Sequence, residues 1–136
     1  MCKCDGIDIE KVRSYASAAM IEAGHQGAEL SILLADDAYV RQLNRRYRGV
    51  DRTTNVLAFP QQESSKRLPP TWLLGDVVIS VEKARRDSEH AGHSLFDEIK
   101  KLMVHGIVHL SGYDHRTGSQ GRRMRLLEQA IIEHTR

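Results

Sequence analysis

Apolar positions recur along the chain in blocks that predict alternating helices and strands. The first block, from Ile9 to Ala23, has apolar residues at helical spacing and stops before Gly24, a residue that commonly ends helices. Similar patterns follow later, and Ser80 and Ser94 stand where two of these helices need an N-cap. The further helices are predicted from Asp36 or Asp37 to Tyr47, Val81 to Glu89, Leu95 to Leu110 and Ser119 to His134.

Shorter apolar runs between the helices predict strands. They are bounded by turn residues, and one of them is rich in β-branched and aromatic side chains and is closed by Pro60. The polar stretch from Gln61 to Pro70 has no hydrophobic period and predicts a surface loop. We therefore expect an α+β fold, close to α/β, in which helices cover a short mixed sheet. The strands are predicted over Glu29–Ala35, Thr53–Phe59 and Leu73–Ser80.

Length and composition limit the class of protein. The 136 residues suffice for one hydrophobic core and are too few for two ordinary domains, so residues 1–136 are expected to form a single domain. No apolar run approaches the ~18 residues that span a bilayer, and the N-terminal segment MCKCDGIDIEKV lacks the apolar core of a secretory signal. We therefore expect a cytoplasmic protein. Cys2 and Cys4 alone make an incomplete metal site, and their role is left open.

The segment HGIVHLSGYDH has the spacing of a metal site. His105 and His109 lie four residues apart, which on a helix places both imidazoles on one face. Gly112 allows the chain to turn back, so that His115 can become the third ligand. Three imidazoles with a fourth position open to water are typical of catalytic zinc, which we predict as a single Zn²⁺ per chain, although other divalent metals suit the same ligands. Four histidines lack comparable spacing and are expected at the surface: His25, His90, His93 and His134.

The same spacing occurs in the metzincin zinc peptidases, HExxHxxGxxH, where the residue after the first histidine is a glutamate that acts as general base. That position is Gly106 here. A zinc peptidase or amidase would need another base, so this activity is an alternative rather than the leading hypothesis. The sequence does not identify the general base. Asp114 could orient an imidazole or cap the turn, and both roles stay open.

Three segments resemble one known family. HGIVHLSGYDH is very similar to the H-G-x-x-H-L-x-G-Y-D-H signature of the YbeY endoribonuclease family. The segment LNRRYRGVDRTTNVLAF, from Leu43 to Phe59, resembles the family's L-N-x-x-Y-R-x-x-D-x-x-T-N-V-L-S-F, and LLGDVVIS resembles its L-L-G-D strand. The resemblance covers roughly Glu29 to the C-terminus. It departs at Ala58, where the family usually has serine, and at Thr53, where proline or alanine is common.

This resemblance implies a function and a set of site residues. It implies a metal-dependent endoribonuclease that acts on single-stranded RNA, in rRNA maturation and ribosome quality control, with RNA and the ribosome or ribosome-associated proteins as partners. The family's metal-binding histidines correspond to His105, His109 and His115, and its Y-R arginine corresponds to Arg48. The other alternative is a ribosome-assembly factor whose metal is structural and whose work is binding. The sequence does not indicate the oligomeric state.

Arginines concentrate near the end of the second predicted helix. Arg48 could clamp a phosphate or stabilise transition-state charge, although an arginine in a last helical turn also complements the helix dipole. The resemblance favours the catalytic role. The cluster could contact an RNA backbone, but aromatic residues make up only 5% of the chain, so an extended base-stacking platform is not expected. The arginines of the cluster are Arg41, Arg45, Arg46, Arg48 and Arg52.

Overall fold

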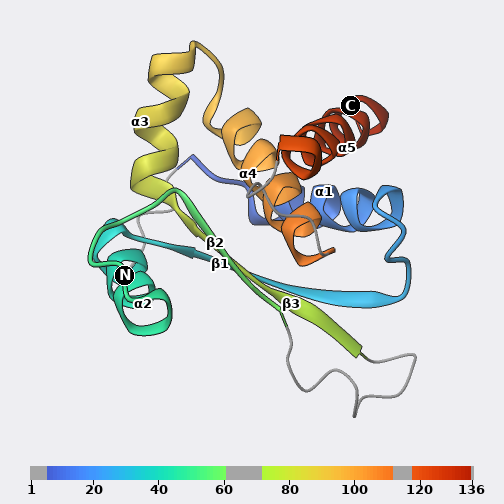
Figure 1. The fold of residues 1–136 in the computed structure, drawn as a ribbon. Coiled ribbons are helices and arrows are strands. Elements are labelled where there is room, and N and C mark those ends of the chain that lie inside the picture. Colours follow the sequence, from blue (N-terminus) through green and yellow to red (C-terminus); the bar gives the residue numbers. More distant parts are fainter. Residues whose placement is uncertain (1–5, 61–71, 112–117, 136) are drawn as a thin grey trace.

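The computed structural model describes residues 6–60, 72–111 and 118–135, and within them it shows five helices and one three-stranded mixed sheet (Figure 1). The α+β fold expected from the sequence is confirmed. In chain order the elements are α1 (Ile9–Glu22), β1 (Ala28–Ala35), α2 (Asp37–Arg48), β2 (Val56–Pro60), β3 (Trp72–Ser80), α3 (Val81–Ala91), α4 (Leu95–Leu110) and α5 (Gly118–His134).

Short polar side chains cap the N-termini of four helices. Asp8 accepts hydrogen bonds from two backbone amides in the first turn of α1, and Asp36 accepts one from Tyr39 in α2. The predicted caps Ser80 and Ser94 are confirmed, since each hydroxyl accepts a backbone N–H three residues later. These bonds satisfy amides that have no partner inside a helix, which fixes where each helix begins.

Strand β3 is the centre of the sheet. It pairs in parallel with β1 and antiparallel with β2, so the order is β1-β3-β2 and both outer strands are edges. Strand β2 begins at Val56, three residues later than the sequence predicted. Thr53 does not join the ladder, and its hydroxyl lies 3.5 Å from the Asp37 carboxylate and 3.4 Å from the carbonyl of Thr54.

Helices cover both faces of the sheet (Figure 1). On one face α1, α4 and α5 share a core with β3, in which Ile99, Met103 and Ile107 of α4 are completely buried. On the other face α2 covers a smaller cluster around Val40 and Leu57. Helix α4 is therefore the central helix of the larger layer, as its apolar sequence predicted. No helix in the described ranges is both long enough and apolar enough to span a bilayer.

Two glycines allow unusually close packing between α4 and the sheet. A Cβ atom built at Gly106 would lie 2.8 and 2.9 Å from the two methyl carbons of Val77 in β3. A Cβ at Gly75 would lie 2.5 Å from the Phe59 carbonyl oxygen and 2.8 Å from a methyl carbon of Leu110. Real Cβ contacts are not this short, so only glycine lets the backbone of α4 lie this close to β3.

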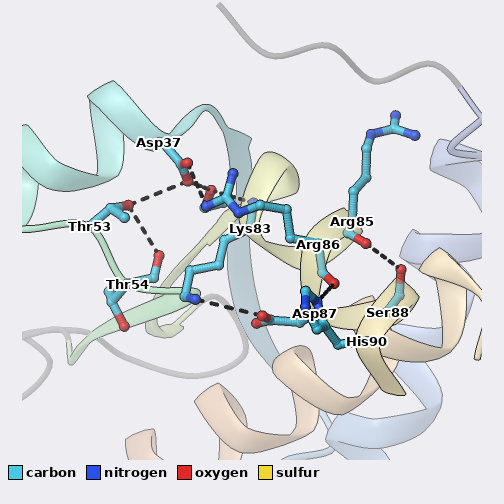
Figure 2. Close-up of polar contacts among 10 residues, drawn as sticks. Asp37, Thr53, Thr54, Lys83, Arg85, Arg86, Asp87, Ser88 and His90 are labelled. Carbon is cyan, nitrogen blue, oxygen red and sulfur yellow. Dashed lines mark hydrogen bonds and ion pairs between the residues drawn. The ribbon is translucent and has the colours of Figure 1, made fainter. Parts of the chain in front are cut away.

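A polar junction joins α2, β3 and α3 at one end of the sheet (Figure 2). The Asp37 carboxylate accepts hydrogen bonds from the Ser80 hydroxyl and, at 2.8 Å, from the Arg86 guanidinium. The Asp37 backbone amide donates to the Glu82 carboxylate at 2.7 Å. Burial alone would raise the pKa of Asp37, but the bonds from Ser80 and Arg86 outweigh it and hold that pKa below its ordinary value.

Candidate metal centre

The C-terminal half of α4 carries His105 and His109 one turn apart. Both side chains are half-buried, on a helix whose other residues there, such as Ile107 and Val108, are fully buried. The helix ends at Leu110, and the hydroxyl of its C-cap, Ser111, donates to the carbonyl of Ile107 at 2.8 Å. The predicted placement of both histidines on one helix is thus present in the structure.

A carboxylate from α5 orients the first histidine. The Nδ1 atom of His105 lies 2.9 Å from Oε2 of Glu128, and the two side chains retain 31% and 17% of their exposure. A neutral imidazole in this contact donates its Nδ1 proton to the carboxylate, which fixes the tautomer and leaves Nε2 as the nitrogen with a lone pair. Carboxylate–histidine pairs of this kind commonly support metal ligands. The sequence analysis missed Glu128.

The third predicted ligand, His115, lies outside the described residues, as do Gly112 and Asp114. Within the described ranges no three side chains of the types that bind metals come together. The assignment of His105, His109 and His115 as one site therefore stays a prediction. Its local support is the ligand chemistry of two imidazoles on one helical face and the oriented ring of His105, which suit a divalent metal such as zinc.

Arg48 is the last residue of α2. Its side chain is exposed, and among the described residues its guanidinium makes no hydrogen bond or ion pair. The helix stops there because Gly49 adopts a left-handed conformation, with φ of 71°, and its amide bonds to the carbonyl of Arg45 at 3.1 Å. An arginine held at a fixed helix end, with its five N–H donors uncommitted within this part of the chain, can bind a phosphate.

Two of the histidines expected at the surface are half-buried instead. His25 Nε2 lies 2.7 Å from the Ser111 hydroxyl, directly after α4, and His93 Nε2 lies 2.6 Å from the buried carboxylate of Glu98. Sequence spacing did not reveal either contact. Ser111 is 86 residues from His25 in the sequence, and Glu98 belongs to α4, which begins only after His93. His90 and His134 are exposed as expected, each bonded to a carbonyl of its own helix.

A cavity of about 810 Å³ lies between α1 and β1 rather than beside His105 and His109. Its walls are mostly apolar, with Val12 and Met20 on one side and Leu30 and Ile32 on the other. The predicted site residues His105, His109 and Arg48 do not line this cavity, so its volume does not locate the predicted site.

The structure explains why glycine follows the first histidine. At Gly106 the backbone of α4 lies against Val77, and a side chain of any size would collide with it. A glutamate at this position, which the metzincin peptidases use as general base, has no room. A zinc peptidase of this type would therefore lack its general base at the position where the metzincins have it.

The comparisons with a family model and with individual proteins agree on one family. A family model described as endoribonuclease YbeY matches residues 5–136. A relative from Aquifex aeolicus is 42% identical over 124 residues, which cover 90% of this chain and 81% of the relative, and one from Pelotomaculum thermopropionicum is 45% identical over 122 residues, which cover 88% and 80%. Both carry the name endoribonuclease YbeY.

A solved structure supports the fold independently. A Thermotoga maritima protein whose structure was determined in solution superposes with a TM-score of 0.66 at 22% sequence identity, over 98% of this chain and 85% of that one. At this level of identity the likeness concerns the arrangement of helices and strands alone.

Proposed function

The chain belongs to the endoribonuclease YbeY family, and from this premise we propose that it cleaves single-stranded RNA with one divalent ion held by His105, His109 and His115. Family membership makes the chain a nuclease, and thus a hydrolase, whose substrate is RNA. The observation that carries the assignment of the centre is the His105–His109 pair on α4, with His105 oriented by Glu128 at 2.9 Å.

The side chains of His105 and Glu128 suit such an ion. Glu128 engages Nδ1 of His105, so this imidazole would bind a metal through Nε2, and the negative carboxylate makes the ring a better electron donor. A divalent ion in this position supplies Lewis acidity, which activates water near neutral pH and offsets charge on a phosphate. Zinc is the first choice because three imidazoles with an open position are its usual catalytic ligands, whereas supply also decides the metal in a cell.

Arg48 is proposed as the residue that contacts the scissile phosphate. Its planar guanidinium can donate two parallel hydrogen bonds to phosphate oxygens, and these bonds strengthen as negative charge accumulates during cleavage. The fixed end of α2 at Gly49 limits where this side chain can reach. Arg48 would then act by binding and charge stabilisation.

We also propose a biological role for this activity. We expect the substrate to be ribosomal RNA, the place of action to be the cytoplasm, and the ribosome or its associated proteins to be partners. The three arginines of the last turn of α2 support an RNA surface but do not identify which RNA. A ribosome-assembly factor with a structural metal would share this surface, so cleavage itself has to be measured.

The test compares wild type with His109→Ala and His90→Ala, all purified without a histidine tag. His90 is the matched control because it is exposed on α3 and bonds only to the carbonyl of Arg86 among the described residues. Metal content is measured by mass spectrometry and cleavage is followed on single-stranded ribosomal RNA, with circular dichroism as a check on folding.

We expect wild type and His90→Ala to hold one ion and to cleave, and His109→Ala to lose most of both while it keeps its fold. Cleavage by His109→Ala at the wild-type rate would refute the proposed centre. Metal binding without cleavage would favour the assembly factor, and cleavage of a peptide library that stops with chelator would favour the peptidase.

A further inference from the structure

An exposed tyrosine stands in the basic last turn of α2. The Tyr47 side chain is 60% exposed, which makes it one of the most exposed large apolar side chains among the described residues. Its ring meets the Phe59 ring edge to face, with centroids 5.6 Å apart and planes at 65°, and the Arg46 guanidinium lies 5.4 Å from its centroid. The ring is thus held in place by two neighbours while most of its surface faces solvent.

The charge around Tyr47 separates it from an ordinary surface tyrosine. Tyr39, in the first turn of the same helix, is also exposed, at 42%, but no basic residue adjoins it in that turn. Three arginines share the last turn with Tyr47: Arg45, Arg46 and Arg48. Arg41, one turn earlier, is already paired with Asp51 at 2.9 Å. An aromatic ring among cations matches single-stranded nucleic acid, whose bases stack on rings and whose phosphates bind arginine.

A chain of contacts links Tyr47 to the C-terminal end of α4, the helix that carries the histidine pair. Phe59, which supports its ring, is the second-last residue of β2, and the tight packing at Gly75 brings the Phe59 carbonyl and the Leu110 side chain together. Leu110 directly follows His109 in α4. Helices α2 and α4 cover opposite faces of the sheet, and β2 is one of its two outer strands among the described elements (Figure 1). An RNA strand bound by both helices would cross the sheet at this edge.

We propose that Tyr47 stacks on one unpaired base of the RNA substrate, while Arg45 and Arg48 bind the phosphates that flank it. The proposal rests on the proposed RNA cleavage and adds a substrate-binding residue to it. A base can reach an exposed ring only when it is outside a duplex, so this contact favours single strands without selecting a sequence. The low aromatic content of the chain is compatible with this, because one ring is needed rather than an extended platform.

The experiment measures binding apart from cleavage. A fluorescein-labelled oligouridylate is titrated with the full chain carrying His109→Ala, which removes hydrolysis, and the affinity is read from fluorescence anisotropy at fixed salt. Three variants are made in this background. Tyr47→Leu removes the ring, Tyr47→Phe keeps it, and Tyr39→Leu removes the other exposed tyrosine of α2 as the matched control.

Loss of one stacked base should weaken binding roughly tenfold in Tyr47→Leu, whereas Tyr47→Phe and Tyr39→Leu should stay within about twofold. A second series places one abasic nucleotide at successive positions of the RNA. At one position the abasic RNA should bind the Tyr47 parent as weakly as the intact RNA binds Tyr47→Leu, and the two losses should not add. A purely structural role of Tyr47 would not produce this non-additivity.

Unchanged affinity in Tyr47→Leu would overturn the proposal, and so would equal losses in Tyr47→Leu and Tyr39→Leu or losses that add at every abasic position. Cleavage of the same RNA by the chain that retains His109, measured in parallel, keeps the two proposals apart. Tyr47-dependent binding without any cleavage would refute the nuclease centre alone, whereas normal cleavage with Tyr47-independent binding would refute the stacking contact alone.

Discussion

The close approach of α4 to β3 predicts an unusual response to the substitution Gly106→Ala. Alanine is the better helix former, by about 1 kcal/mol in an exposed helix. At this position, however, its Cβ would lie 2.8 and 2.9 Å from the methyl carbons of Val77, and both residues are buried. Overpacking of a filled core costs about 1–3 kcal/mol. The difference leaves a net loss of stability of about 1 kcal/mol, opposite in sign to the helix preference.

Urea unfolding followed by circular dichroism measures this loss, and a double-mutant cycle with Val77→Ala tests its cause. Val77→Ala alone should destabilise the protein because it opens a cavity, but it should also remove the collision. In that background Gly106→Ala should become neutral or stabilising by up to about 1 kcal/mol. If Gly106→Ala stabilises the protein equally in both backgrounds, the two elements do not pack as described, and the argument against a glutamate at this position fails with it.

The remaining predictions concern the support of the metal centre and the junction at α2. Glu128→Gln should weaken zinc binding about 10–100-fold because His105 loses its charged partner, and competition with a chromogenic chelator measures the affinity. The control is Glu133→Gln, which changes an exposed glutamate of the same helix. Equal zinc affinities of the two variants would show that Glu128 does not assist the ligand. Asp37→Asn should lower the free energy of unfolding at neutral pH. Because the pKa of Asp37 is lowered in the folded state, its stabilising effect is present above the ordinary value of about 3.9 and is lost as pH falls through the folded value. The difference between variant and wild type should therefore shrink in unfolding curves taken below about pH 4, and a difference constant with pH would contradict this reasoning.

Local patterns were sufficient to predict the elements of the fold. The helical spacing from Leu95 to Leu110 predicted both ends of α4, and the hydroxyls of Ser80 and Ser94 predicted two helix starts. The predicted strand began at Thr53, three residues too early, because β-branched residues favour strands on average and this average preference does not fix where a strand begins.

The candidate site was only partly predictable for a similar reason. His105 and His109 are neighbours because a helix repeats, so their spacing alone revealed them. Glu128 is 23 residues from His105 on a different helix, and its contact depends on how α5 packs on α4. His25 meets Ser111 across 86 residues, which no local pattern encodes. The role of Arg48 came from the family resemblance, since its position at a helix end is equally typical of dipole complementation.

The two edges of the sheet differ in how they would behave in a crowded or partly denatured solution. Strand β2 has five residues and ends at Pro60, whose nitrogen cannot donate a hydrogen bond. Strand β1 has eight residues, pairs only with β3 among the described elements, and exposes 43% of Leu33. A long apolar edge offers unpaired backbone groups to another chain. Self-association of this protein is therefore expected to grow from β1, by addition of strands across molecules. The proposed RNA-binding residues of α2, beside β2 at the opposite edge, would remain accessible in such assemblies.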